Sequence, residues 1–168
     1  MNLEKRWLDL AENLQIDTQS AHQVYAKIEK KYSESHRKYH NLQHLRELFL
    51  FADKYDDMIE EKELVELAIW YHDVVYSVLR PAKNELKSAQ FALQEIPEGI
   101  LSNAESERLF CWIESTKKHI IPTKHATLSG QLFMDFDMAI IGAAPNKYKV
   151  YAQNISCLLY TSPSPRDS

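Results

Sequence analysis

The apolar side chains of this 168-residue chain recur three and four positions apart, with few residues able to interrupt the pattern. Leu3, Trp7, Leu10 and Leu14 set this spacing at the N-terminus, and on an α-helix it places them on one face. Only three glycines and six prolines are present, which leaves little material for the tight turns of a β-rich architecture. The sequence therefore predicts a single all-α domain with a substantial core.

Prolines, glycines and polar breaks divide the chain into seven or eight predicted helices. We expect these helices at about residues 3–14, 18–32, 39–52, 64–76, 84–96, 103–118, 127–141 and from 146 onward. The three tryptophans are expected to pack in the core, at Trp7, Trp70 and Trp112. Three of the histidines are assigned to the surface, namely His22, His36 and His125.

The last residues, 157–168, abandon the amphipathic pattern for a stretch rich in serine and proline. This stretch resembles a translated adapter or vector sequence. We therefore expect the domain to span residues 1–156 and residues 157–168 to be non-native or disordered. On this interpretation the native C-terminal helices are missing.

Composition excludes several classes of protein. The net charge of −4 gives no electrostatic reason to expect nucleic acid or a membrane surface as a partner. No apolar run approaches the roughly 18 residues of a membrane span, and the charged N-terminus differs from an export signal. Two cysteines, Cys111 and Cys157, form neither a disulfide framework nor a metal-binding spacing. A cytoplasmic protein is expected, and a homo-oligomer stays open.

Histidine and aspartate side chains interrupt apolar stretches at three places, residues 39–44, 72–73 and 135–137. His40 and His44 are four apart, which on a helix places both imidazoles on one face. His72 continues the apolar stripe of Leu64 and Ala68 and should point inward. Burying such groups is costly unless they are paired, and neutral imidazoles with ionised carboxylates suit a divalent cation. The pattern therefore indicates a metal site, and a metal site favours hydrolysis.

The order of these segments resembles the HD-domain superfamily of metal-dependent phosphohydrolases, in which an HNxxH motif, an HD pair and a later aspartate follow one another. Longer strings resemble a bacterial branch described as predicted HD phosphohydrolases: residues 37–44 (RKYHNLQH), 70–76 (WYHDVVY), 84–85 (NE), 116–119 (TKKH) and 133–142 (FMDFDMAIIG). The resemblance covers about residues 1–156 and implies an all-α HD fold. It does not define the substrate.

The resemblance implies four protein ligands for at least one divalent ion, which is Mn, Mg, Co, Fe or Zn: His44, His72, Asp73 and Asp137. Helix positions two apart diverge by about 200°, so Asp135 and Asp137 are not expected to bind the same ion. Asp137 is preferred because its surroundings match the family pattern and because it shares a stripe with Phe133.

Two side chains of the motifs, His40 and Asp73, are expected to take part in catalysis. Cyclic-nucleotide phosphodiesterases share the HNxxH motif, and by similarity to them His40 protonates the leaving oxygen while His44 binds metal. A histidine with an unperturbed pKa of about 6.5 suits that acid role. Asp73 is expected to help orient the attacking water. Four further residues are candidates for binding the substrate or a second metal: Arg37, Lys118, His119 and Glu85.

The expected function is hydrolysis of a phosphate ester, with a nucleotide or small phosphorylated metabolite as substrate. Two alternatives stay open. Some HD folds hold two irons and activate oxygen, and here His119 and Glu85 are available as extra ligands. The other alternative is a non-catalytic module that senses a nucleotide or binds a partner.

Overall fold

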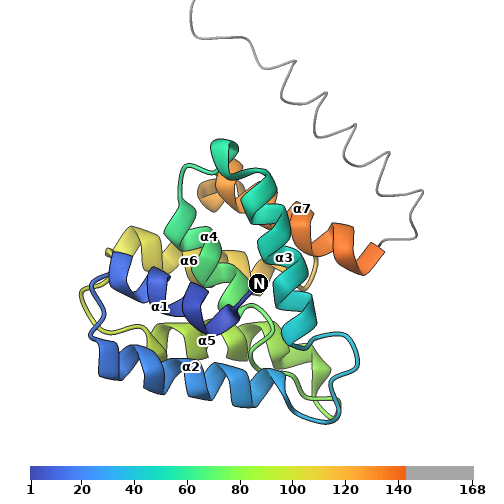
Figure 1. Ribbon diagram of the computed structural model, residues 1–168. Coiled ribbons are helices and arrows are strands. Elements are labelled where there is room, and N and C mark those ends of the chain that lie inside the picture. The colour runs from blue at the N-terminus through green and yellow to red at the C-terminus, as the bar shows by residue number, and fades with distance from the viewer. Residues whose placement is uncertain (143–168) are drawn as a thin grey trace, which may run out of the picture.

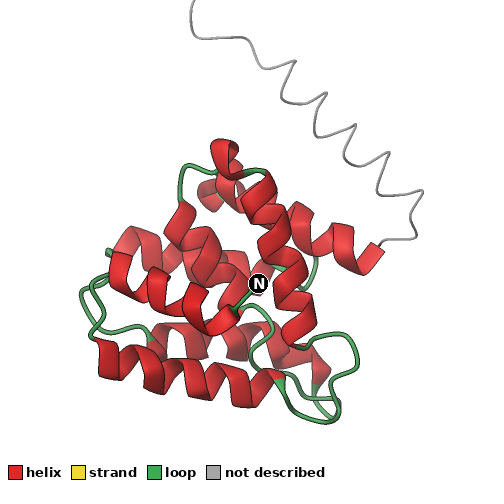
Figure 2. Ribbon diagram, in the orientation of Figure 1, coloured by secondary structure: helices red, strands yellow, loops and turns green. Residues whose placement is uncertain are grey.

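The structure, a computed structural model, describes residues 1–142 (Figure 1), so the predicted eighth helix and the 157–168 tail lie outside it. Seven α-helices are present: α1 (Leu3–Asn13), α2 (Thr18–Tyr32), α3 (Leu42–Lys54), α4 (Lys62–Tyr71), α5 (Asn84–Glu95), α6 (Asn103–Ser115) and α7 (Leu128–Gly142). Three short 3₁₀ helices join them: η1 (Asp56–Met58), η2 (Pro81–Lys83) and η3 (Thr123–His125). No strand occurs in residues 1–142 (Figure 2), which confirms the all-α prediction.

Helix α4 is the centre of the bundle and contacts α3, α5, α6 and α7. Its side chains are apolar on nearly every side, and Val65, Leu67 and Ile69 are fully buried. A helix of this kind is stable only when neighbours cover it all round. The placement of α4 matters for function because its C-terminal end delivers His72 and Asp73.

The tryptophans lie in the core, as predicted. Trp7 on α1 meets Trp70 on α4 edge to face, with ring centroids 5.6 Å apart, and its indole N–H donates to the Ala21 carbonyl of α2 at 2.8 Å. Trp112 on α6 packs so closely against α7 that a Cβ built at Gly130 would lie 2.5 Å from the indole ring. Gly130 therefore allows α6 and α7 to approach each other.

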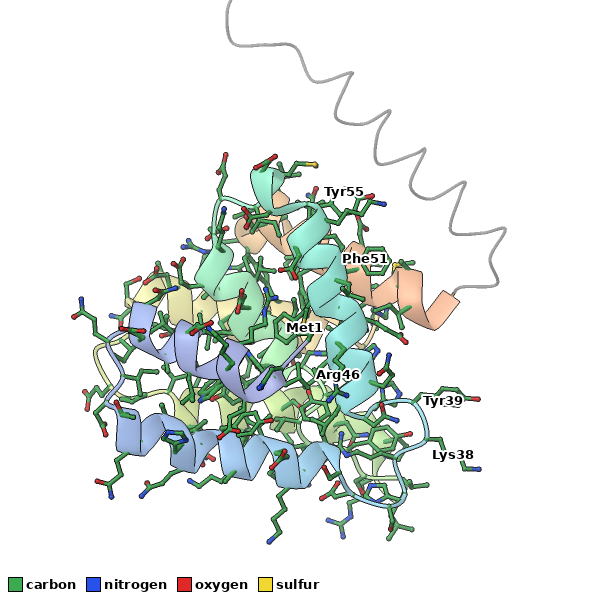
Figure 3. The ribbon with its side chains drawn as sticks, in the orientation of Figure 1. Met1, Lys38, Tyr39, Arg46, Phe51 and Tyr55 are labelled. Carbon is green, nitrogen blue, oxygen red and sulfur yellow. The ribbon has the colours of Figure 1, made fainter. Side chains whose placement is uncertain are left out.

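Helices α3 and α7 lie side by side (Figure 1). They carry two of the predicted metal ligands, His44 and Asp137, respectively. Phe51 and Tyr55, both labelled on α3 in Figure 3, stack on Phe136 of α7 with ring centroids 5.7 and 5.8 Å away. Stacked aromatic pairs of this kind add to the free energy of burial. The packing fixes α7 relative to α3.

Of the three histidines assigned to the surface, His22 and His36 are exposed, whereas His125 is half-buried beside Trp112. Between residues 1 and 142, no helix combines the length and the apolar character needed to cross a bilayer.

Candidate metal centre

The start of α3 positions His44. Asn41 is the N-cap of α3, and its side-chain oxygen accepts from the backbone N–H groups of Gln43 and His44 at 2.9 and 3.3 Å. The prediction that the helix begins at Tyr39 and carries both motif histidines on one face is therefore wrong. His40 precedes the cap and lies in a turn, and its ring meets that of His44 edge to face at 5.7 Å.

The end of α4 positions His72 and Asp73. The sequence predicted this helix to continue to Tyr76, but it ends at Tyr71. The Arg37 guanidinium donates to the carbonyls of Asp73 and Val74 at 2.7 and 2.9 Å. These carbonyls point to Arg37 instead of continuing the helical ladder, so the backbone turns directly after His72.

Arg37 is itself buried, and two more of its N–H groups donate to the His40 carbonyl and the Glu34 carboxylate at 3.0 and 3.1 Å. Its guanidinium thus ties the turn before α3 to the turn after α4. Four of its five N–H groups are thus directed at protein oxygens, and phosphate binding by Arg37 stays a prediction.

Asp137 enters the site from the middle of α7, and both Asp137 and His72 are almost completely buried. Oδ2 of Asp137 accepts from Nε2 of His119 at 2.8 Å. Oδ1 is buried and accepts no hydrogen bond from the described residues, although Nε2 of His44 lies 3.3 Å away. A buried carboxylate oxygen without a donor carries a high desolvation cost.

The carboxylates of Asp73 and Asp137 both lie close to the Nε2 atoms of His44 and His72. Nε2 of His44 and Nε2 of His72 are 3.1 Å apart. Oδ2 of Asp73 lies 3.1 Å from His72 Nε2 and 3.6 Å from His44 Nε2. Oδ1 of Asp137 lies 3.3 and 3.6 Å from the nitrogens of His44 and His72, respectively. His44, His72 and Asp137 form a wholly buried group that could hold a metal ion.

These separations fit a shared ion. Metal–ligand bonds of about 2.1 Å place neighbouring ligand atoms about 3.0 Å apart in an octahedral site and about 3.4 Å apart in a tetrahedral one. The separations of 3.1 to 3.6 Å begin within this range and end slightly above it. His72 is also prepared as a ligand, because its Nδ1–H donates to the Ile69 carbonyl at 2.9 Å and leaves Nε2 facing the site.

The electrostatics of the site show that positive charge is needed there. Burial acts to lower the pKa of the His72 imidazole, but the Asp73 and Asp137 carboxylates outweigh it and raise that pKa to about 9. Burial acts to raise the pKa values of Asp73 and Asp137, yet the neighbouring imidazoles bring both below the ordinary range. A proton on His72 thus compensates the buried Asp137 and the half-buried Asp73 carboxylates in the metal-free protein, and a divalent cation could take its place.

His40 lies beside this group. Its Nδ1 donates to Oδ2 of Asp73 at 2.7 Å, and this hydrogen bond raises the pKa of its imidazole despite partial burial. The ring packs on Tyr76 with centroids 4.9 Å apart. His40 also belongs to a second potential ligand group, with His44 and Asp73. Its geometry therefore permits either a proton-transfer role or metal binding.

A cavity of about 500 Å³ opens at His40 and His44. It is lined by Lys38, Tyr39, His40, Asn41, Gln43, His44, Glu47 and Ile140. Lys38 and Tyr39 project from the turn before α3 towards solvent (Figure 3). The sequence analysis did not identify Gln43 and Glu47 as residues that line a cavity. The available signal was their position in the first two turns of α3, the helix that carries His44.

The other predicted site residues are more scattered. Lys118 is exposed in the turn after α6, which ends at Ser115 and not at Lys118 as predicted. His119 reaches the site through Asp137. Glu85 lies in the first turn of α5, half-exposed overall, with an Oε2 atom that is buried and has no hydrogen-bond partner among residues 1–142.

Comparison of the chain with protein-family models, curated proteins and solved structures gave no match in any of the three.

Proposed function

We propose that this chain is an HD-type metal-dependent phosphohydrolase that cleaves a phosphate ester of a nucleotide or a small phosphorylated metabolite. The observation that carries the proposal is the buried group of His44, His72 and Asp137, with Asp73 beside it: each carboxylate lies 3.1 to 3.6 Å from the two imidazole nitrogens, and one Asp137 oxygen is buried without a hydrogen-bond partner among residues 1–142. The resemblance of the sequence motifs to HD phosphohydrolases supports the same assignment.

A divalent ion at this point would lower the pKa of a bound water and polarise a phosphoryl oxygen. The chain itself supplies the other requirements. Asp73 accepts from Nδ1 of His40 and thereby fixes the ring. The raised pKa of His40 keeps its imidazole protonated further towards neutral pH, so that Nε2 carries a proton for a leaving alkoxide.

The cavity supports a small substrate. Its volume of about 500 Å³ is within the range of pockets that enclose small organic ligands. The Lys38 ammonium and the amides of Asn41 and Gln43 line it, and these groups suit phosphate and hydroxyl oxygens. Lys118 is exposed close in sequence to His119 and is a candidate for a further phosphate contact.

Elemental analysis of the purified protein tests the site, and a screen of phosphorylated metabolites with Mn, Mg, Co and Fe added back tests the reaction. We expect one or more divalent ions per chain and release of inorganic phosphate. The exposed His22 on α2 offers a matched control: His22→Ala should retain metal and turnover, whereas His44→Ala should lose both. Absence of metal from the wild-type protein would rule out the proposal.

A di-iron oxygenase is a second candidate function, favoured by one observation. The two oxygens of Asp137 face different histidines: Oδ1 lies 3.3 Å from Nε2 of His44, and Oδ2 accepts from His119. His44 and His119 would thus be available as ligands of two separate ions. Two irons per chain in anaerobically purified protein, with oxygen consumption and no phosphate release, would favour this reaction. Bound metal without turnover of any phosphorylated substrate would favour a non-catalytic sensing module.

A further inference from the structure

The backbone at His119 has an unusual conformation. Among residues 1–142, only two residues other than glycine have a positive φ angle, Gln15 at 59° and His119 at 53°. Both follow the end of a helix, Gln15 after α1 and His119 after α6. Glycine occupies this left-handed region without steric cost, and helices commonly end with it for that reason.

The turn at His119 is closed by a backbone hydrogen bond and does not depend on the histidine side chain. The backbone N–H of His119 donates to the Ser115 carbonyl at 2.7 Å and closes the last turn after α6, and a glycine could make the same bond. The histidine side chain instead points at α7, where its Nε2 lies 2.8 Å from Oδ2 of Asp137. A carboxylate only accepts hydrogen bonds, so Nε2 of His119 carries the proton.

We propose that His119 is a positioning residue that holds the Asp137 carboxylate so that Oδ1 faces His44 and His72. This inference rests on the metal site of the proposed function. A carboxylate rotates about its Cβ–Cγ bond, and a hydrogen bond to one oxygen fixes the direction of the other. Hydrogen-bond partners of this kind orient ligands and contribute about 10- to 100-fold to metal affinity.

The contrast with Gln15 supports the assignment. Gln15 is exposed, and its backbone N–H makes a comparable helix-ending bond to the Glu12 carbonyl at 2.9 Å. The two positions therefore share a backbone conformation and a location just after a helix. Only His119, however, contacts a predicted metal ligand, Asp137. What distinguishes His119 is therefore its side-chain hydrogen bond to Asp137 and not its backbone conformation.

The test compares His119→Gly with the matched control Gln15→Gly, with Mn²⁺ or Co²⁺ affinity measured by chelator competition. Glycine suits both backbones, so we expect both variants to fold with the helical circular dichroism of wild type. His119→Gly also removes the donor to the buried Oδ2 of Asp137 and should melt several degrees lower in the metal-free state. His119→Gly should bind metal about 10- to 100-fold more weakly, and Gln15→Gly should bind as wild type does. Unchanged affinity in His119→Gly would overturn the inference.

A second variant separates positioning from direct coordination. His119→Gln retains an N–H donor of similar reach and should recover part of the lost affinity. At saturating Co²⁺, His119→Gly should keep the wild-type stoichiometry and visible spectrum, because the ligands are unchanged. A lost ion or a changed spectrum would instead make His119 a ligand and overturn the positioning role.

The same measurements distinguish failure of this inference from failure of the proposed function. Wild-type protein that binds metal but hydrolyses no phosphate ester would contradict the proposed function, while a weakened metal affinity in His119→Gly would still support the role of His119. Wild-type protein that hydrolyses a phosphate ester, with equal metal affinity in wild type and His119→Gly, would contradict only the positioning role.

Discussion

The molecule contains two clusters of charged side chains packed between helices, and they differ in how their charge is balanced. In the first, Arg6 of α1 pairs with Asp53 of α3 and Glu66 of α4 at 2.8 and 2.7 Å, while its guanidinium lies 4.2 Å above the Phe49 ring. In the second, His44, His72, Asp73 and Asp137 meet at the end of α4.

The Arg6 cluster contains its own cation. Arginine stays charged at every physiological pH, and its donors match the carboxylates of Asp53 and Glu66. Burial still raises the pKa of Glu66, since desolvation outweighs the attraction of Arg6. The histidine–aspartate cluster has one buried and one half-buried carboxylate and only imidazoles to face them, so its charge is balanced only when protons or a cation bind. A cluster that depends on an external cation is suited to bind one.

The volume of the neighbouring cavity does not distinguish the two clusters. A cavity of about 570 Å³ lies beside the Arg6 cluster, and the one beside His40 and His44 measures about 500 Å³. The difference lies in the chemistry of the lining. Each cluster has one buried polar atom without a hydrogen-bond partner among residues 1–142, Nε of Arg6 and Oδ1 of Asp137. The Arg6 atom belongs to a cation that already pairs with two carboxylates, whereas the Asp137 atom is a carboxylate oxygen with no permanent cation beside it.

The largest expected effect is complete loss of metal from the second cluster. His72→Ala or Asp73→Ala removes one donor from a site with about four, so bound metal and activity should both disappear. Arg6→Met should leave the metal content unchanged because Arg6 belongs to the other cluster. Elemental analysis after dialysis measures this, and full metal content in both His72→Ala and Asp73→Ala would show that the histidine–aspartate pair is structural.

The two aspartates of α7 sharpen the same comparison. Asp137→Asn should lose metal, because a neutral amide is a much weaker ligand than a carboxylate. Asp135, which is less buried and outside both potential ligand groups, should tolerate replacement by Asn with its metal retained. Metal loss in Asp135→Asn alone would reverse the assignment on α7.

The next effect is on turnover alone. His40→Ala should keep its metal and lose about 10²- to 10⁴-fold in kcat, the usual contribution of a general acid. The loss should be smallest for substrates whose leaving group needs no proton, such as nitrophenyl phosphates. Steady-state kinetics at matched metal occupancy measures it. Loss of metal from His40→Ala, with metal retained in His44→Ala, would make His40 the ligand.

Removing the ion pairs of Arg6 should lower the stability of the fold and leave metal binding and turnover unchanged. Arg6→Met leaves Glu66 partly buried without its cation and should lower the free energy of unfolding by about 1 to 3 kcal/mol. The double variant Arg6→Met with Glu66→Leu removes both charges and should recover most of that loss. Urea unfolding of the single and double variants tests this. A double variant no more stable than Arg6→Met would show that the pair itself stabilises the fold.

Much of the fold follows from local sequence rules. The spacing of Leu64, Ala68 and His72 predicted that His72 points inward, and His72 is buried. The predicted boundaries of the two helices at the site were wrong for different reasons. Asn41 is a local N-cap signal that was overlooked, and α3 begins at Leu42, three residues after the predicted start. The end of α4 depends on a tertiary contact, because Arg37 takes the carbonyls that follow it.

Periodicity alone could not assign the role of Arg37. An arginine beside a helix is usually solvated, and only the folded structure shows that its donors meet carbonyls from a turn 36 residues away. The meeting of His44, His72 and Asp137, by contrast, was predicted as a ligand set by motif resemblance and is present as a buried group. The contact between His119 and Asp137 was not predicted, because it depends on a left-handed backbone at His119.

The last expected effect is a gradual pH dependence that separates metal-free from metal-loaded protein. The pKa of His72 is about 9 in the folded metal-free state and about 6.5 when unfolded. A group whose pKa is raised by folding stabilises fully below its unfolded pKa and loses that contribution as pH rises through the folded value. The difference of about 2.5 pKa units corresponds to up to about 3 kcal/mol, so the metal-free protein should lose up to about 10 °C of melting temperature between about pH 6.5 and 9.

Metal should reverse that trend. Protons compete with the ion for Nε2 of His72, so metal affinity should rise over the same pH range and the melting temperature of the loaded protein should hold or increase. Arg6 remains charged throughout, so the first cluster contributes no opposing slope from its cation. Thermal melts at fixed ionic strength, with excess chelator or excess Mn²⁺, measure the two curves. Parallel curves would mean that the proton on His72 and the ion do not occupy the same place.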